Sequence, residues 1–410
     1  MKALILGIFC FFLILRVWAQ PGCTDPQAQN FSADATENDG SCTYAAAAAE
    51  LTNRKELPSL LSESSGLLYT DGKLWTLNDS GGEAAIYRIS ETDGSVEQVV
   101  YLADAKNKDW ESITADEDYI YIGDFGNNSK GNRSNLRVYR VSKAALGAAA
   151  ETTVTADIIY FTYQDQEDLE PADNNNTDFD CEAFLVKNNI VHLFTKEWIS
   201  PHNTRHYTFP ATPGTHVAVP VEELAADGLI TGASLSDNNE IVLVGYTSNK
   251  LSLFMWLLFD YQEDRFFSGN KRRIALGSAL QGQVEGVTFT TNGNGYVSTE
   301  RISSPFGTVP PRLYSFSVAG FVNSIPTPAL KVRPVPLAKG KALHVELSNT
   351  QETASTITLI GADGKVYLLK NVAAAAGINE QLQLDHLNSG VYFLRVTNSL
   401  ETYTTKVLLQ

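Results

Sequence analysis

The sequence predicts an all-β protein whose main body is a β-propeller. Five similar phrases recur along the chain, each opening a strand and each followed after a turn by a second strand. They are SSGLLY from Ser64, WESITA from Trp110, CEAFLV from Cys181, ITGASL from Ile230 and VEGVTF from Val284. One supersecondary unit repeated at this kind of spacing is typical of a propeller, because a single four-stranded blade cannot bury both of its faces alone.

We expect five blades between residues 49 and 320. Blade two shows the four strands most clearly, as WESITA, YIYIGD, LRVYRVS and DIIYFTY. The last repeat lacks a fourth strand, whereas LTNRKELPSLL before the first opening occupies the position of one. An N-terminal strand is therefore expected to close the ring and remove an open edge. Six blades are the alternative, if the long interval between Glu111 and Glu182 contains a degenerate blade. The polar run from Asp165 to Phe179 favours an inserted loop there instead.

Residues 1–19 have the pattern of a secretory signal peptide. Lys2 precedes an apolar run, and VWA comes directly before Gln20. A membrane anchor is the alternative, but the run is shorter than the roughly 18 apolar residues that a spanning helix needs, and Arg16 interrupts its end. We expect no transmembrane segment in the mature chain.

Cysteine usage agrees with export. Residues 20–48 form a short module and linker in which Cys23 and Cys42 are placed to form a disulfide in an oxidising compartment. Cys181 is then unpaired, and its apolar strand predicts a buried, inert thiol.

The module GCTDPQAQNFSADATENDGSCTY resembles a short cysteine module of secreted Bacteroidetes proteins. Its Asp25, Asp34, Asn38 and Asp39 carry oxygens of the kind that bind calcium. The alternative is a disulfide-stapled turn whose Asp, Asn and Gly residues serve backbone geometry.

Residues 329–410, after a linker at 321–328, form a different kind of domain. The strands ALHVELS, TITLIGA, VYLLKN, VYFLRVT and TTKVLLQ alternate with turns and predict an Ig-like β-sandwich. The last third resembles the type A sorting domain of the type IX secretion system, although RPVP stands where that family usually has PNP. The resemblance implies the type IX machinery as a partner and a secreted or outer-membrane-surface location, with no chemistry in the domain itself.

The first strand of each propeller blade lines the central channel. The equivalent position in the five openings is occupied by three carboxylates and two hydroxyls: Ser65, Glu111, Glu182, Thr231 and Glu285. Such carboxylates repel one another unless they are protonated, hydrated or neutralised, and an oxygen-only ring suits calcium. The alternative is that they cap backbone N–H groups and hold only water. Glu63 can replace Ser65 if a bulge lies there.

A second polar set follows the second strands. It comprises Asp79, Asp124, Glu197 and Glu300, with Lys196 and Arg301 beside two of them. Nearby loops add possible anion-binding residues, namely Arg133, His202, Arg205 and His206. Surface and inter-blade ion pairs are the alternative for each of these residues.

Two resemblances concern the body. DWESITADEDYIYIGDFGNN, DFDCEAFLV and QVEGVTF resemble an uncharacterised group of secreted bacterial propellers with DxEA and GDxGDN phrases. The spacing of GKLWTLND, WESITA, CEAFLV and VEGVTF is also similar to that of the calcium-activated apyrases. That second resemblance implies a central calcium held by Ser65, Glu111, Glu182, Thr231 and Glu285, with Thr in place of one Ser.

Three functions follow from these observations. The first is an exported, ion-centred propeller that binds a ligand or partner at one channel mouth without turnover. The second is a calcium-dependent phosphoester or phosphoanhydride hydrolase in which Asp124 or Glu300 positions water, while Arg301 and Lys196 hold the charged product. The third is lactonase or esterase chemistry at a central calcium, as in some six-bladed propellers. The net charge of −16 argues against nucleic-acid binding.

Overall fold

The computed structural model describes residues 20–199, 202–249, 252–304, 307–322, 330–335, 342–398 and 402–409. The chain divides into two compact units, residues 1–322 and 323–410. The predicted signal peptide, residues 1–19, lies outside the described residues. In the part of the chain that the structure describes, no helix is long and apolar enough to cross a membrane.

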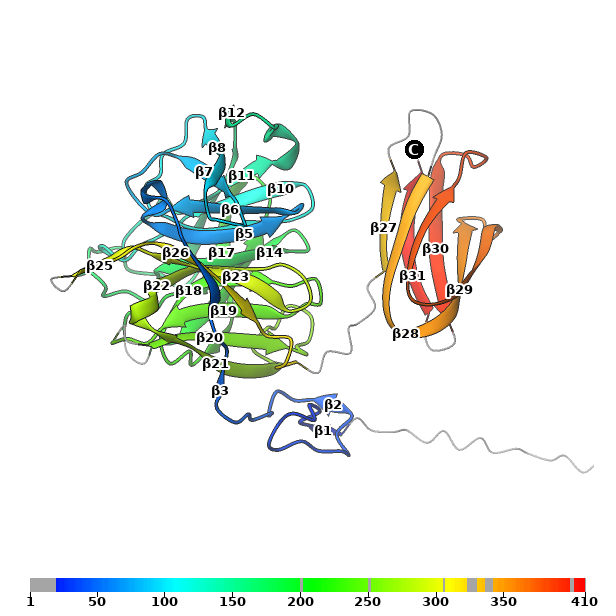
Figure 1. The fold of residues 1–410 in the computed structure, drawn as a ribbon, viewed down its shortest axis with the longest axis horizontal. Coiled ribbons are helices and arrows are strands. Elements are labelled where there is room, and N and C mark those ends of the chain that lie inside the picture. The colour runs from blue at the N-terminus through cyan, green and yellow to red at the C-terminus, as the bar shows by residue number, and fades with distance from the viewer. Residues whose placement is uncertain are drawn as a thin grey trace, which may run out of the picture. The chain divides into compact units, whose positions relative to one another are not determined.

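The first unit contains five blades of four antiparallel strands, which we number along the chain (Figure 1). Blades one and two are β5 (Ser64–Thr70), β6 (Lys73–Asn78), β7 (Ala85–Ile89) and β8 (Val96–Leu102), then β9 (Trp110–Ala115), β10 (Tyr119–Asp124), β11 (Arg137–Ser142) and β13 (Asp157–Tyr163). Blades three and four are β14 (Cys181–Lys187), β15 (Ile190–Thr195), β16 (Thr204–Pro210) and β17 (Gly214–Leu224), then β18 (Leu229–Leu235), β19 (Ile241–Tyr246), β20 (Ser252–Phe259) and β21 (Asn270–Ser278). Blade five is β22 (Gln283–Phe289), β23 (Asn294–Glu300), β26 (Arg312–Ser317) and β4 (Thr52–Glu56).

The ring closes as the sequence predicts. The first strands of neighbouring blades contact one another in turn, and β22 contacts β5. The N-terminal strand β4 pairs antiparallel with β26, so the first and last parts of the propeller share one sheet. Because the interval between β13 and β14 is a loop rather than further strands, the count is five blades and not six.

Several short strands and 3-10 helices are added to the blades, and the repeat pattern did not predict them. Two edge strands are added in parallel, β12 (Glu151–Val154) on β8 and β3 (Ala47–Ala48) on β21. The alanine-rich stretch expected to be linker thus contributes a strand to blade four. The outer strands β13 and β17 also pair in parallel and join blades two and three at their rims. The remaining small elements are β24 (Ile302–Ser304), β25 (Gly307–Val309), η1 (Ser59–Leu61), η2 (Lys143–Ala145) and η3 (Ala279–Gln281).

An apolar cluster fills each of the five interfaces between neighbouring blades. The period-two alternation of the strands produces these clusters, because successive side chains point to opposite faces of a blade. In β10, Ile120 and Ile122 pack toward blade one, whereas Tyr121 packs toward blade three. Each large side chain buried in this way contributes about 1.5–3 kcal/mol. The interfaces hold the inner strands in a fixed ring, and that ring positions the site.

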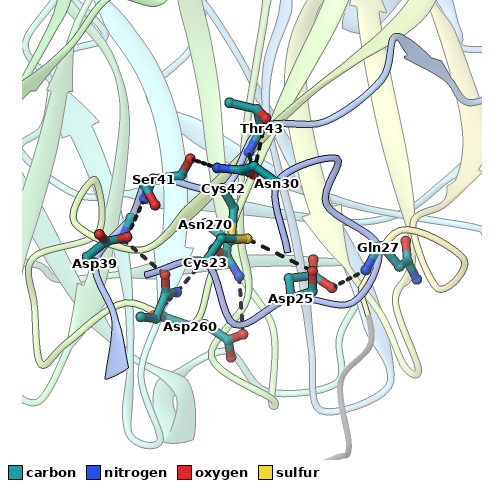
Figure 2. The surroundings of a disulfide bond; sticks show 12 residues. Cys23, Asp25, Gln27, Asn30, Asp39, Ser41, Cys42, Thr43, Asp260 and Asn270 are labelled. Atoms are coloured by element: carbon teal, nitrogen blue, oxygen red, sulfur yellow. Dashed lines mark hydrogen bonds between the residues drawn. A yellow bond between two sulfur atoms is a disulfide. The ribbon is translucent and has the colours of Figure 1, made fainter. Parts of the chain in front are cut away.

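The cysteine module packs on blade four (Figure 2). The predicted Cys23–Cys42 disulfide is present, and the module contains one short parallel pair, β1 (Pro21–Gly22) with β2 (Glu37–Asn38). The Asn38 side-chain amide donates to Asn270 Oδ1 at 3.1 Å, and Lys271 donates to the Gly40 carbonyl at 3.2 Å. Gly40 permits this close approach, since a Cβ there would lie 2.2 Å from the Ser268 carbonyl oxygen.

The module's oxygen-bearing side chains hold its turns. An Asp25 carboxylate oxygen accepts from the backbone N–H of Gln27 at 2.9 Å, and one of Asp39 accepts from that of Ser41 at 3.0 Å. These are Asx turns, in which a side chain satisfies the backbone two residues on. The contacts match the stapled-turn interpretation of the module.

The second unit is the predicted C-terminal β-domain, built around one apolar core. Its strands are β27 (Leu330–Val335), β28 (Ala342–Gly361), β29 (Val366–Gln383), β30 (Gly390–Asn398) and β31 (Thr402–Leu409). The strands expected at ALHVELS and TITLIGA form the single strand β28, because the intervening NTQETAS contains no Gly or Pro and is accommodated by register shifts against β29.

Candidate functional site

The five channel positions are structurally equivalent. In every blade the pairing between first and second strand shifts by one residue, and the unpaired residue is Ser65, Glu111, Glu182, Thr231 or Glu285. A β-bulge of this kind re-aims a side chain at the edge of a sheet. The repeat seen in the sequence therefore corresponds to a bulge repeated five times around one axis.

A polar cavity of about 240 Å³ lies at this end of the channel. First strands begin and second strands end here, because the two run antiparallel. The cavity is lined by Ser65, Asp79, Glu111, Asn128, Asn174, Asn175, Glu182, Lys196, Trp198, Tyr246, Gln283, Glu285 and Glu300. Four of the five bulge residues thus border one space. The fifth, Thr231, does not border it, and its hydroxyl donates instead to the Val284 carbonyl at 2.8 Å.

On the blade-three side of the cavity the charges are compensated within the chain. Lys196 Nζ lies 2.5 Å from both carboxylate oxygens of Glu182. Asp180, two residues earlier, accepts from the backbone N–H of Asn127 and from the Trp198 indole, each at 2.7 Å. Burial lowers the pKa of the Lys196 ammonium, but the adjacent Glu182 carboxylate outweighs this and raises it well above its ordinary value. Lys196 therefore remains charged and acts as an internal cation.

On the blade-two side the carboxylates lack such compensation. Oxygens of Asp79, Asp109 and Glu111 all lie within 4.8 Å of one another. Glu111 is only 5% exposed, and among the described residues no hydrogen-bond or ion-pair partner reaches its carboxylate. The Asp109 carboxylate forms an ion pair with the Arg133 guanidinium at 3.6 Å, and Arg133 lies closer to Asp124, at 2.7 Å. Three acidic side chains are thus held together with one weak positive contact.

The loop after β10 leaves space beside these carboxylates. Gly126 lies against them, and a Cβ there would be 2.0 Å from Glu111 Oε1 and 2.7 Å from Asp109 Oδ2. The backbone N–H of Gly126 also donates to the Asp109 carbonyl at 3.3 Å. The GDFGNN phrase therefore closes over the blade-two carboxylates without filling the space between them.

Burial and mutual repulsion raise the pKa of the cavity carboxyls. Burial, followed by the neighbouring Asp79, raises the pKa of Asp109 to about 7. The same two causes raise the pKa of Glu111 well above its ordinary value. Burial is also the main cause that raises the pKa of Glu285 and of Glu300 to about 8. In the absence of a cation, the cavity thus disfavours ionisation of the groups that line it.

The donor set fits a hard divalent cation. Asp79, Asp109 and Glu111 offer oxygen atoms only, which favours calcium or magnesium over zinc or copper. Calcium binds oxygens at about 2.3–2.6 Å, so atoms within 4.8 Å of one another can share one coordination sphere. The polar cavity beside them leaves room for waters or ligand oxygens to complete the six to eight contacts that calcium takes.

The second predicted polar set is divided by the structure. Lys196 and Glu300 border the cavity, as does Asp79. Asp124 does not border it, and Arg133 and Arg137 bind its carboxylate at 2.7 and 3.3 Å. Arg301 is exposed on the surface and lies outside the cavity lining.

The remaining residues of that set form internal pairs. Arg205 binds Glu197 at 2.6 Å and Asp165 at 3.0 Å. His206 is buried and pairs with Glu222 at 3.1 Å, and His202 contacts the Glu197 backbone carbonyl at 3.2 Å. Arg133, Arg205 and His206 thus form internal ion pairs, and His202 contacts a backbone carbonyl. These contacts favour the ion-pair interpretation of the four residues over an anion-binding site on the loops.

Sequence reasoning missed seven residues of the cavity region, namely Asp109, Asn128, Asn174, Asn175, Trp198, Tyr246 and Gln283. Asp109 precedes Glu111 by two positions, so both side chains emerge on one side of the strand start. The D-x-E pattern in DWES and DCEA was the available signal. Asn128, Asn174 and Asn175 come from two loops and carry no periodic signal, because their position depends on how those loops pack.

The fold and this site define a channel-bearing propeller followed by a separate β-domain, and comparison with known proteins identifies that domain. Residues 332–410 match the family described as secretion system C-terminal sorting domain. The predicted type IX sorting domain is therefore confirmed, and the protein is secreted or carried to the cell surface. No curated protein matches the chain.

Solved structures with a similar arrangement of strands are distant. The aldose sugar dehydrogenase of Streptomyces coelicolor in its PQQ-bound form is 13% identical, with a TM-score of 0.41, and the match covers 65% of this chain and 98% of that one. The Bombyx mori GH32 β-fructofuranosidase BmSUC1 is 10% identical, with a TM-score of 0.36, covering 88% and 87%.

Proposed function

We propose that the protein is an exported β-propeller that binds one calcium ion at the blade-two side of its channel mouth and receives a ligand there. The uncompensated Glu111 carboxylate, buried beside Asp79 and Asp109, carries this proposal. Two unit charges about 4 Å apart repel by about 4 kcal/mol at an effective dielectric of 20. A bound divalent ion turns that repulsion into attraction and allows all three groups to ionise.

Because Lys196 already neutralises Glu182, we place the proposed ion away from the channel axis. The ring predicted from sequence places the ion among Ser65, Glu111, Glu182, Thr231 and Glu285. Glu182 is already neutralised by Lys196, and the Thr231 hydroxyl is used by a backbone carbonyl. The proposed calcium ligands are therefore Asp79, Asp109 and Glu111, with Ser65 and Glu285 bordering the same cavity.

The alternative, a calcium-dependent phosphoester or phosphoanhydride hydrolase, has one observation in its favour. Glu300 lines the cavity with a pKa of about 8, a value suited to proton transfer near neutral pH. Its other predicted residues support it less, because Asp124 is bound by two arginines and Arg301 lies outside the cavity lining. Lactonase or esterase chemistry was tied to six blades, and the ring has five. Binding without turnover is accordingly the favoured function.

Calcium titration of the purified protein by isothermal calorimetry tests the proposal. We expect one calcium per chain and a higher thermal midpoint with calcium than with EDTA, since a ligand at 100 times its Kd adds about 2.7 kcal/mol of stability. Glu111→Gln should lower calcium affinity by at least about 100-fold, whereas Glu117→Gln, at an exposed position and with the same change of charge, should leave it unchanged. Unchanged calcium affinity of Glu111→Gln would contradict the proposal. Calcium-dependent phosphate release from nucleotides or sugar phosphates, lost in Glu300→Gln, would favour the hydrolase.

A further inference from the structure

Three asparagines line the cavity that two of the proposed calcium ligands, Asp79 and Glu111, also border. Asn128 follows the GDFGNN turn after β10, and Asn174 and Asn175 belong to the loop inserted between β13 and β14. Two loops thus place asparagines beside the same space. The inserted loop, which the sequence suggested only as a polar spacer, forms part of the mouth.

Backbone hydrogen bonds fix the two loops to each other. The N–H of Asn175 donates to the Asn128 carbonyl and that of Ala172 to the Lys130 carbonyl, both at 2.8 Å. The Gln166 side chain adds a bond to the Gly131 carbonyl at 2.7 Å. Asn175 has a φ of 57°, a left-handed conformation that asparagine tolerates better than most residues. The backbone that carries the three asparagines is therefore held in place before any ligand arrives.

These carboxamides are available to a ligand. Within the described ranges, no hydrogen bond or ion pair involves the side chains of Asn128, Asn174 or Asn175. Each carboxamide offers two N–H donors and a carbonyl acceptor. The cavity floor adds carboxylate acceptors, among them Glu285 and Glu300. The lining therefore suits a ligand whose groups both donate and accept hydrogen bonds.

Charge restricts the ligand further. One calcium with Asp79, Asp109 and Glu111 leaves a net negative charge when all three ionise, and Lys196 is committed to Glu182. Because the three ionised ligands outweigh one divalent ion, a phosphate or a carboxylate would meet like charge. An apolar ligand would bury the polar groups of the lining without giving them hydrogen-bond partners, which is unfavourable. A neutral, polyhydroxylated molecule satisfies both restrictions.

We propose that the mouth binds a neutral sugar, with adjacent hydroxyls on the calcium ion and further hydroxyls on the amides of Asn128, Asn174 and Asn175. The proposal rests on the calcium site of the proposed function. The cavity, at about 240 Å³, is smaller than the roughly 300–1,000 Å³ typical of drug-sized ligand sites and is matched to a single sugar unit. Trp198 borders the same space and adds an aromatic surface to its wall.

The test uses the calcium-loaded full chain, a neutral glycan array, and calorimetry with the neutral sugars that the array retains. We expect saturable binding of a neutral sugar that EDTA abolishes. Asn128→Ala and Asn174→Ala should each weaken it about tenfold, the effect of losing a hydrogen bond to a ligand, without changing calcium affinity. Asn176→Ala, in the same loop but outside the cavity lining, is the matched control and should bind like the unaltered protein.

The outcomes separate this inference from the function on which it rests. If calcium binds but no neutral glycan does, the sugar site is wrong and the calcium site stands. If glucose 6-phosphate binds more tightly than every neutral sugar, the charge argument is wrong. If spermidine binds the calcium-free protein and competes with calcium, the cavity is a site for organic cations instead. If calcium itself does not bind, both proposals fail together.

Discussion

Blades two and three have the same acidic pattern at the start of their first strands, but among the residues that the structure describes, only in blade three does a cationic side chain of the protein neutralise the glutamate. Both have D-x-E, as Asp109 and Glu111 or Asp180 and Glu182, and in both the glutamate is the bulged residue. In blade three, Lys196 neutralises Glu182, and the Trp198 indole and an Asn127 amide bind Asp180. In blade two, Glu111 has no such partner among the described residues.

The difference shows that residues at equivalent positions of one ring can have two roles. Glu182 stabilises the fold through its pair with Lys196, and Glu111 is available to bind an ion. A buried carboxylate that pairs with a buried ammonium is costly to separate from it. A buried carboxylate with no partner needs a proton or an external cation. Blade three therefore stabilises the channel from within, while blade two is completed by an ion from solution.

The largest effect is expected from breaking the internal pair. Lys196→Met removes the ammonium and leaves Glu182 buried beside the other acidic groups. Breaking a buried pair from one side costs about 3–5 kcal/mol. Urea unfolding in EDTA should show a loss of this size, and added calcium should restore part of it by entering beside Glu182. If Lys196→Met unfolds like the unaltered protein, blade three is not compensated as described.

The opposite result is expected for blade two. Glu111→Gln should lower calcium affinity by at least about 100-fold, since even groups that only orient metal ligands are worth 10–100-fold. In EDTA the same variant should be as stable as the unaltered protein or more so, because a neutral amide replaces a carboxyl whose ionisation is disfavoured by burial and by Asp79. Calorimetry and thermal unfolding measure the two effects. A variant that loses stability in EDTA but keeps calcium affinity would reverse the roles of the two blades.

Gly126→Ala probes the space between the carboxylates without changing charge. The added Cβ would lie 2.0 Å from Glu111 Oε1 and 2.7 Å from Asp109 Oδ2, so these carboxylates must shift. We expect calcium affinity to fall about tenfold, since a misplaced ligand costs about one hydrogen-bond equivalent, or 1.4 kcal/mol. Gly82→Ala is the control, because its Cβ would meet no atom closer than Asn107 Nδ2 at 4.0 Å. Equal affinities for the two variants would rule out the close approach.

An effect of pH is expected in blade three, at a histidine pair that lies outside the cavity lining. His192 Nδ1 lies 2.9 Å from His206 Nε2, and burial lowers the pKa of His192 to about 3. Because this value lies below that of the unfolded chain, the His192 contribution to stability is present above about pH 6.5 and is lost as the pH falls toward 3. The loss approaches about 1.4 kcal/mol per pH unit.

Thermal unfolding between pH 7 and pH 4 measures this loss. The acid-side slope should be shallower in His192→Gln than in the unaltered protein, and that difference in slope should be the same with calcium and with EDTA. A difference that changes with calcium would connect the histidine pair to the mouth.

Much of the fold was predictable because it depends on repetition. The five openings, the closing strand β4 and the Cys23–Cys42 disulfide all follow from local pattern and spacing. The fusion of two expected strands into β28 was not predictable from turn residues, because a long strand with bulges looks like two short strands in sequence.

The candidate site was less predictable. Periodicity identified the bulge residues, but it could not show that Lys196 lies against Glu182 or that Thr231 bonds to a backbone carbonyl. Asp124 was expected at the mouth from its place at the end of β10, but its pairing with Arg133 and Arg137 depends on the following loop. The asparagines of the mouth likewise depend on loop packing, for which the sequence has no periodic signal.

An X-ray structure of crystals grown with calcium, recorded for anomalous scattering, tests the central claim most directly. The account predicts one calcium peak bounded by Asp79, Asp109 and Glu111, beside Gly126, with the Lys196–Glu182 pair intact. A peak on the channel axis between Glu182 and Glu285 with Lys196 displaced, or no peak at this mouth, would contradict the division of the ring into a compensated and an ion-binding half.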